Sequence, residues 1–167
     1  MSRIRTILHP TDFSRASAPA FKRAVQMAKD NRAQLLILHV LAPASPMLMT
    51  DGYVPPKVYD DMEAAARAEA QKQLRRLVEK AKHSGARVKP ILLEGIAHER
   101  IIQAARSRKA DLVVIGTHGR SGVGRLICGS VAESVLRGTT IPIFLRRPPE
   151  APVELPSIAA PPMEVVR

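Results

Sequence analysis

The chain is short of the residues that build several common kinds of protein. It has a single cysteine, Cys128, so no internal disulfide can form and no Cys/His pair is available for structural zinc. Tryptophan is absent and aromatic residues make up 3% of the sequence, which leaves Leu, Ile, Val and Ala to build a core. No apolar run approaches the ~20 residues of a membrane span, and the N-terminal one is too short for a signal peptide. We therefore expect a cytoplasmic protein that makes no membrane contact.

The length of 167 residues suits one domain, and a hydrophobic content of 46% can supply its core. The last part of the chain, 148–167, holds six prolines and does not continue the pattern of the preceding elements. We expect a folded domain over residues 1–147 followed by a flexible, Pro-rich C-terminal tail over 148–167.

The formal net charge is +11 at pH 7. Such an excess is compatible with a nucleic acid, an anionic membrane, a small anion such as a nucleotide, or simply a solvated basic surface. The basic residues are spread along the sequence, and nothing in it resembles a helix-turn-helix, a zinc finger or an aromatic stacking platform. The sequence by itself makes a nucleic-acid partner unlikely.

Apolar runs alternate with amphipathic stretches along the whole domain. Continuous apolar runs predict buried parallel strands, and apolar residues at helical spacing predict helices between them. Residues 42–56, with four prolines, predict a long loop that is either a functional lid or disordered. The predicted strands lie at 4–8, 33–41, 86–95, 110–116 and 138–147, and the helices within 12–33, 57–84, 97–109 and 130–137.

This order, βαβαβαβαβ, predicts an α/β fold with an open, doubly wound, five-stranded parallel sheet. In such a sheet a ligand binds beyond the carboxyl ends of the strands, at the point where the strand order reverses. The stretch "GTHGRSGVGRLICGS", from Gly116 to Ser130, begins at such a strand end and holds five glycines.

Two familiar phosphate motifs do not fit this stretch. A P-loop needs Gly, four residues and then Gly-Lys-Ser/Thr, and no such string occurs. A Rossmann fingerprint needs GxGxxG after the first strand, whereas the only GxG pair, Gly122 and Gly124, follows the fourth, and Ile127 stands where its last glycine would be.

The spacing that remains is Gly116, two residues, Gly119, nine residues, Gly129 and Ser130. It resembles the nucleotide-binding signature of the universal stress protein family, in its ATP-binding branch, and "PTDFS" after the first strand adds to the resemblance. The similarity extends from "ILHPTDFS" to "IPIFL", nearly the whole predicted domain. It implies the adenine-nucleotide α-hydrolase-like version of the doubly wound fold.

The chemistry of the spacing agrees with a phosphate site. Gly116 and Gly119 allow the backbone to pass close to a ligand because they carry no Cβ. Gly129 and Ser130 stand where the next helix should begin, and the first N–H groups of a helix point outward at an anion. The Ser130 hydroxyl can donate to a phosphate oxygen.

The resemblance implies a role for each matching position. The acid after the first strand, Asp12, would approach the ribose hydroxyls, and Val40 would offer its backbone to adenine. Ile115 and Gly116 would lie near the sugar, whereas His118 occupies a variable position between the first two glycines. The implied binding positions are Pro10, Thr11, Asp12, Val40, Ile115, Gly116, His118, Gly119, Gly129, Ser130, Val131 and Ala132.

Structural explanations stand beside these roles. One alternative to a binding role is that Asp12, or Ser14 nearby, simply caps a helix. In the same way, Ser130 could have no role beyond capping the last helix. The glycines can be only turn formers. His9 and His39 stand near strand ends, where a metal site is conceivable, but their spacing matches no common ligand motif.

No nucleophile elbow, paired carboxylates or oriented base accompanies the predicted site, so we expect a binder and not an enzyme. The resemblance implies a stress-responsive regulator that binds ATP, with Mg²⁺ carried by the nucleotide; AMP or cAMP remains open as the ligand. Alternatives are slow ATP hydrolysis to ADP or AMP, and a basic adaptor for nucleic acid or an acidic protein. Relatives pair their last strand, which predicts a homodimer through Ile141 to Leu145.

Overall fold

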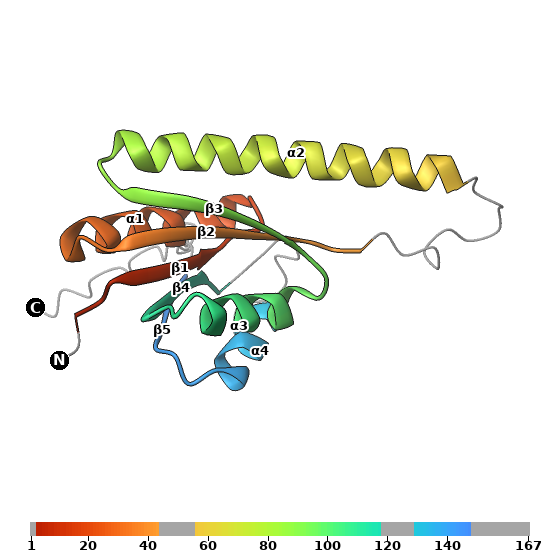
Figure 1. The fold of residues 1–167 in the computed structure, drawn as a ribbon. Coiled ribbons are helices and arrows are strands. Elements are labelled where there is room, and N and C mark those ends of the chain that lie inside the picture. The colour runs from red at the N-terminus through yellow and green to blue at the C-terminus, as the bar shows by residue number, and fades with distance from the viewer. Residues whose placement is uncertain (1–2, 44–55, 118–128, 148–167) are drawn as a thin grey trace, which may run out of the picture.

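The computed structural model describes residues 3–43, 56–117 and 129–147. Within them five strands alternate with four α-helices, and a short 3-10 turn, Arg15–Ser17, precedes the first helix (Figure 1). The strands are β1 Thr6–Pro10, β2 Gln34–Leu41, β3 Arg87–Glu94, β4 Leu112–Gly116 and β5 Ile143–Arg146. The helices are α1 Ala18–Asn31, α2 Pro56–His83, α3 Ala97–Ser107 and α4 Ser130–Gly138.

The strands form one parallel sheet in the order β3-β2-β1-β4-β5. The chain builds outward from β1 to β3, and then crosses back to place β4 on the other side of β1. The strand order therefore reverses between β1 and β4, which is where an open α/β sheet leaves a crevice at its carboxyl edge. The predicted fold class is confirmed.

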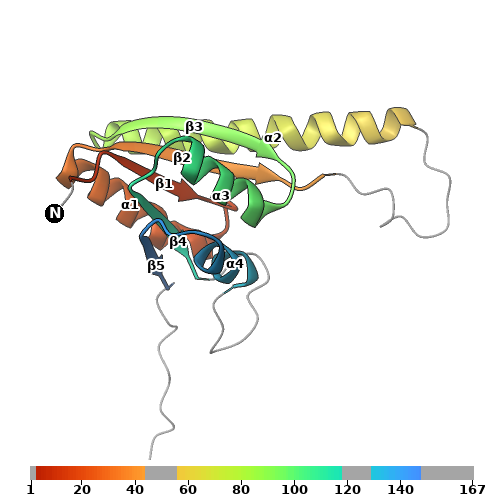
Figure 2. The same ribbon diagram turned by 60° about the horizontal axis from the view of Figure 1, so that its bottom comes forward.

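Helices cover both faces of the sheet because alternate side chains of each strand point to opposite faces (Figure 2). Ile7 packs into the core beneath α1 and α2, whereas its neighbour Leu8 packs into a second core beneath α3 and α4. Both cores consist almost entirely of aliphatic and alanine side chains, as the shortage of aromatic residues predicts.

Most predicted elements are found within a few residues of their expected bounds, and two prolines explain where boundaries moved. Pro19 does not interrupt α1, because it lies in the first turn, where its missing N–H has no intrahelical partner to lose. Pro142 lies just outside β5, which is shorter than predicted, and its carbonyl accepts a bond from the Val113 N–H at 2.9 Å.

The expected 42–56 loop and the expected tail lie almost wholly outside the described residues. Among the helices that the structure describes, none combines the length and the apolar character that crossing a membrane requires.

Candidate functional site

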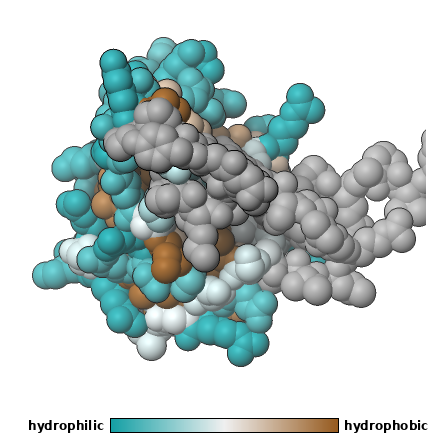
Figure 3. All heavy atoms as spheres, turned by 90° about the vertical axis from the view of Figure 1, so that its right-hand side faces the viewer, coloured by the Kyte–Doolittle hydropathy of each residue, from teal (hydrophilic) through white to brown (hydrophobic). Residues whose placement is uncertain are grey.

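A cavity of about 300 Å³ opens at the carboxyl edge of the sheet, beside the reversal between β1 and β4. Figure 3 looks onto this end of the molecule and shows apolar side chains near the middle of the face, with hydrophilic ones around the rim. The walls come from the ends of β1, β2 and β4 and the first turns of α3 and α4. The lining residues are Pro10, Thr11, Asp12, Ser17, Leu38, His39, Val40, Ala97, Ile101, Ile115, Gly116, Thr117, Gly129, Ser130, Val131 and Ala132.

Every predicted binding position that the structure describes lines this one cavity. Three separate strand ends and a helix start contribute to it, although they are as far apart in the sequence as Pro10 and Ala132. His118 and Gly119, also predicted, lie outside the described residues.

A set of short hydrogen bonds holds Asp12 at the end of β1. One carboxylate oxygen accepts the Ser14 N–H at 3.0 Å and the Ser14 hydroxyl at 2.7 Å. Burial raises the pKa of the Asp12 carboxyl, but hydrogen bonds from Ser14 and Ser17 outweigh it and hold that pKa below its ordinary value. Asp12 is therefore an anion at neutral pH and presents acceptors to the cavity. The capping role belongs to Ser14, whose hydroxyl accepts the Ser17 N–H.

The same loop contains a residue with a strained backbone and is held against β2 by side-chain contacts. Phe13 adopts φ 63°, a left-handed conformation that bulky residues rarely take. Its N–H donates to the Thr11 hydroxyl at 3.1 Å, and its ring lies 4.2 Å from that of His39. His39 in turn donates from Nδ1 to the Thr11 carbonyl at 2.8 Å, since a carbonyl can only accept. The loop and the end of β2, including Val40, are thus fixed relative to one another.

The first turn of α4 faces the cavity with backbone N–H groups. Gly129 is the N-cap, and it has no side chain to accept the N–H groups of Val131 or Ala132. Its own N–H donates to the Thr117 carbonyl at 2.5 Å, which joins the helix start to the end of β4. Ser130 is the first helical residue and not the cap, so its hydroxyl is not the capping acceptor. Donors without intrahelical partners, together with the helix dipole, favour an anion here.

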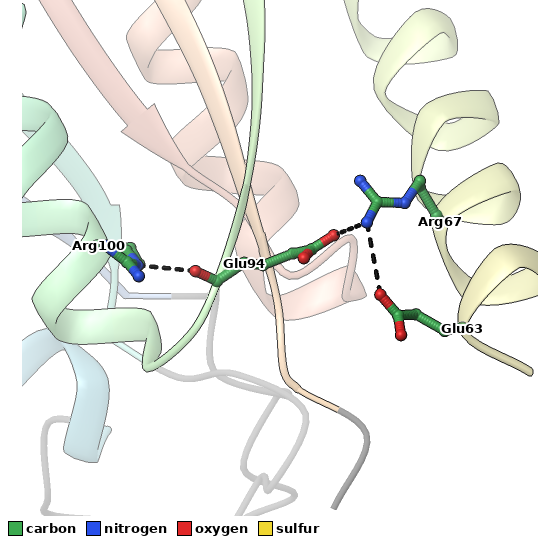
Figure 4. Close-up of polar contacts among 4 residues, drawn as sticks. All are labelled: Glu63, Arg67, Glu94 and Arg100. Carbon is green, nitrogen blue, oxygen red and sulfur yellow. Dashed lines mark hydrogen bonds and ion pairs between the residues drawn. The ribbon is translucent and has the colours of Figure 1, made fainter. Parts of the chain in front are cut away.

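The remaining wall is positioned by contacts between α2, β3 and α3 (Figure 4). The Glu94 carboxylate pairs with Arg67, which also reaches Glu63 at 3.5 Å, and the Glu94 carbonyl accepts a bond from Arg100 Nε at 2.7 Å. Gly95, between β3 and α3, has φ 130°, and a Cβ there would lie 2.7 Å from Arg100 Nε. This turn therefore needs glycine, and it directs Ala97 into the cavity.

Sequence reasoning missed several lining residues, chiefly because their types are unremarkable. Apolar residues such as Leu38, Ala97 and Ile101 look like core positions in any amphipathic pattern. His39 carried a signal, since it directly precedes the predicted Val40 at a strand end. The missed positions are Ser17, Leu38, His39, Ala97, Ile101 and Thr117.

A buried histidine, His9, supports the site from beneath. It is fully buried on the α1 side of β1, 5.9 Å from the Phe21 ring, and its Nδ1 donates to the Val114 carbonyl at 2.8 Å. Burial lowers its pKa to about 4, although the bond to Val114 and the Asp12 charge act in the opposite direction. His9 is neutral at pH 7, and its Nε2 has no hydrogen-bond partner among the residues that the structure describes.

The bond from His9 replaces one that the sheet cannot make. The N–H of Val113 points toward β5, so the carbonyl of Val114 points toward β1. In the register Leu8↔Val113 the donor facing that carbonyl would be the N–H of residue 10. Residue 10 is proline and has no N–H, and the His9 side chain satisfies the carbonyl instead.

No metal site emerges from the two strand-end histidines. His9 lies in the core beneath α1, whereas His39 lies against Phe13 at the cavity wall. Over residues 3–43, 56–117 and 129–147, no group of three or more His, Cys, Asp or Glu side chains is arranged to hold a metal ion.

Comparison with known proteins identifies the family. The profile of the Universal stress protein family matches residues 3–147. The chain is 30% identical over 146 residues to the universal stress protein MJ0531 of Methanocaldococcus jannaschii, covering 87% of this chain and 84% of that protein. The solved structure of universal stress protein UspA from Lactobacillus plantarum has a TM-score of 0.76 and 26% identity, covering 88% of this chain and all of that one.

Two other solved structures with this fold contain a nucleotide. One is a universal stress protein in complex with cAMP, with a TM-score of 0.66 and 25% identity, covering 87% of this chain and 98% of that one. The other, from Archaeoglobus fulgidus, is a complex with dAMP, with a TM-score of 0.62 over 86% of this chain and 98% of that one; at 20% identity that likeness shows the fold alone. The chain described here belongs to the universal stress protein family.

Proposed function

We propose that this chain binds an adenine nucleotide, ATP first, in the cavity at the carboxyl edge and acts as a regulatory stress-response protein. The observation that carries the proposal is the convergence of Asp12, Val40 and the α4 N-terminus on one cavity. An acid, an apolar slot and a cluster of N–H donors are the groups that ribose, adenine and phosphate require. The family member solved with cAMP supports the ligand class.

In this proposal different lining residues contact the ribose, the base and the phosphates of the nucleotide. The ionised Asp12 accepts bonds from ribose hydroxyls, while Val40 lies beside Leu38 and Ile101, which offer apolar surface to the base. The N–H groups of Val131 and Ala132 and the Ser130 hydroxyl receive the phosphates. Mg²⁺ enters with the nucleotide, and we assign it no protein ligand.

We propose binding without efficient turnover. Among the described residues that line the cavity, the only carboxylate is that of Asp12, which is already engaged by Ser14 and assigned to ribose. His39 donates its Nδ1 proton to a backbone carbonyl and packs on Phe13, which commits that nitrogen to the loop and not to an attacking water. Slow hydrolysis remains the alternative, and release of ADP or AMP over many turnovers would demonstrate it.

Calorimetric titration with ATP and Mg²⁺ tests the proposal directly. We expect saturable binding, and a loss of about tenfold or more in Asp12→Asn because bonds to a charged acceptor contribute about 1.5–3 kcal/mol. Asp30→Asn, an exposed change on α1, is the matched control and should bind as the unmodified chain does. Parallel titrations with AMP and cAMP rank the ligands. Absence of heat at millimolar concentrations of all three would refute the proposal.

We also propose a homodimer through the exposed edge of β5, which pairs only with β4 within the described chain. Leu145 is 36% exposed on that edge, and exposed apolar edges favour pairing. Light scattering at micromolar concentration should give twice the chain mass, and Leu145→Lys should halve it. Leu136→Lys, at an exposed leucine of α4, should leave the dimer intact. A monomeric mass for the unmodified chain contradicts the proposal.

A further inference from the structure

The edge of the sheet opposite the cavity carries a row of basic side chains. Because all five strands are parallel, the connections from α1, α2 and α3 into β2, β3 and β4 meet at this amino edge, on the left in Figure 1. Each of the strands β1, β2, β3 and β4 has at least one exposed basic residue just before its first residue or at it. These cations are Arg3 and Arg5 before β1, Arg32 before β2, Arg87 at the start of β3, and Arg108 and Lys109 before β4.

Neighbouring strands place these residues side by side. Arg87 pairs in register with Gln34, whose N–H donates to the Arg5 carbonyl at 2.8 Å, and the Arg87 guanidinium donates to the Arg32 carbonyl. With strands about 4.8 Å apart, the row from β3 across β2 and β1 to β4 spans about 14 Å. In the sequence the basic residues are spread along the chain, and folding brings this subset into one line.

The charge of the row is not neutralised by the described residues. The one carboxylate inside it, Asp111, accepts the N–H groups of Arg5 and Thr6 at 2.8 and 2.9 Å and offsets one of the six positive charges, which leaves an excess of five. The ion pairs that the described residues form use Arg67, Lys72, Lys82 and Arg137, none of which belongs to the row. The row therefore presents a net positive field to solvent.

Two of the cations occupy positions where glycine would be easier. Arg32 and Lys109 follow α1 and α3 in the left-handed region, with φ 52° and 51°. The equivalent turn after α2 has Gly85 at φ 85°, so the same fold uses glycine at one of three similar turns and a cation at the other two. Basic residues do suit helix C-termini, but a lysine or arginine one turn earlier would serve the dipole without the strain. Charge is therefore retained at two turns whose backbone conformation favours glycine.

We propose that this row, the amino-edge basic row, docks the phosphate backbone of a nucleic acid. Arginine dominates it, and the guanidinium group matches phosphate geometry better than an ammonium does. A length of about 14 Å covers about four nucleotides of one duplex strand. The row includes no aromatic side chain to stack on a base, so it reads the backbone and not the sequence. It lies at the opposite edge of the sheet from the nucleotide cavity, so the two sites act independently.

Arg32→Gly with Lys109→Gly separates this role from folding. The double variant removes two charges of the row and also relieves two left-handed residues, so its thermal stability should not fall. Lys22→Gln with Lys57→Gln removes the same charge from exposed positions away from the row and is the matched control. Each is titrated as the full chain, with saturating ATP present, against fluorescent 20-base-pair duplexes of DNA and of RNA over a series of salt concentrations.

The unmodified chain should bind at least one duplex, with log K falling linearly in log salt. The glycine variant should weaken binding about tenfold or more and reduce that slope by about 2, since each phosphate contact contributes about 0.9. Whichever duplex binds more tightly identifies the source of the backbone. The proposal is overturned by no binding at low salt, by an equal loss in the Lys22/Lys57 control, or by a polyglutamate peptide that binds as tightly with the same slope, which would assign the row to an acidic protein.

Discussion

Replacement of Gly129 by aspartate should abolish nucleotide binding while leaving the fold as stable as before, or slightly more so. Gly129 is the N-cap of α4 and supplies no side-chain acceptor to the first turn. Aspartate is among the best N-caps and adds a favourable charge at the positive end of the helix, a gain of roughly 0.3–1 kcal/mol. Gly129 has a φ of −53°, which any residue can adopt, so the backbone need not change when aspartate replaces it.

The same aspartate carboxylate should prevent phosphate from binding at the proposed site. It would accept the N–H groups of Val131 or Ala132 and place a negative charge where the phosphates should lie. Bonds to a charged ligand contribute about 1.5–3 kcal/mol each, and the added repulsion is of order 1–4 kcal/mol. We therefore expect ATP affinity to fall at least about a hundredfold by calorimetry, while the melting temperature holds or rises.

Gly129→Ser provides the control, because a serine cap competes for the N–H groups without adding charge and should give an intermediate affinity. Gly129→Val adds bulk without an acceptor, and should lose affinity while the chain stays folded. If Gly129→Asp bound ATP as tightly as the unmodified chain, the α4 N-terminus would not be the phosphate site.

The fold was largely accessible from the sequence because its pattern is repetitive and strongly apolar. Runs such as 34–41, whose residues 35–38 are buried on both faces, have few alternatives to a central parallel strand. The largest shift of a strand boundary, the start of the last strand from 138 to Ile143, lies beside a proline, and the effect of a proline depends on which N–H the structure needs. Pro19 lies where no N–H is needed, and Pro142 lies outside the ladder that it was expected to enter.

The site residues could be predicted from the sequence where glycine spacing and an acid at a strand end marked them. They could not be predicted where residues of common types form the cavity wall. Nothing local distinguishes Ala97 or Ile101 from core residues, since their place on the wall depends on Arg100, Glu94 and the turn at Gly95. The amino-edge basic row was hidden for a different reason. Its members come from the N-terminal segment and from the three connections into β2, β3 and β4, and only the strand order places them together.

Removal of the His9 side chain should be among the most destabilising single changes in the chain. His9→Ala leaves an empty space beside Phe21 and strips the buried Val114 carbonyl of the donor that the structure gives it. A cavity of this kind and an unsatisfied carbonyl together cost about 3–5 kcal/mol. Urea denaturation at pH 7 measures the loss, and His83→Ala, an exposed histidine of α2, should change stability little.

The pH dependence gives His9 a signature of its own. The folded pKa, about 4, lies below the ordinary histidine value of 6.5, so the unfolded chain binds the proton first as pH falls. The free energy of unfolding is therefore fully retained above pH 6.5 and declines by about 3 kcal/mol on going down to pH 4. In His9→Ala the decline of the unfolding free energy between pH 6.5 and pH 4 should disappear. The decline that Asp12 causes at lower pH, because its folded pKa is lowered, should remain.

Pro10→Ala tests the reason that a histidine is needed at all. Restoring an N–H at residue 10 supplies the donor that the β1–β4 register directs at the Val114 carbonyl. His9→Ala should then cost about 1–2 kcal/mol less in the Pro10→Ala background than in the unmodified chain, because the carbonyl has regained a partner while the cavity remains. Equal losses in both backgrounds would mean that His9 stabilises the sheet by packing alone. A smaller loss would show that a proline at the rim of the carboxyl-edge cavity is tolerated because a core histidine completes the strand beneath it.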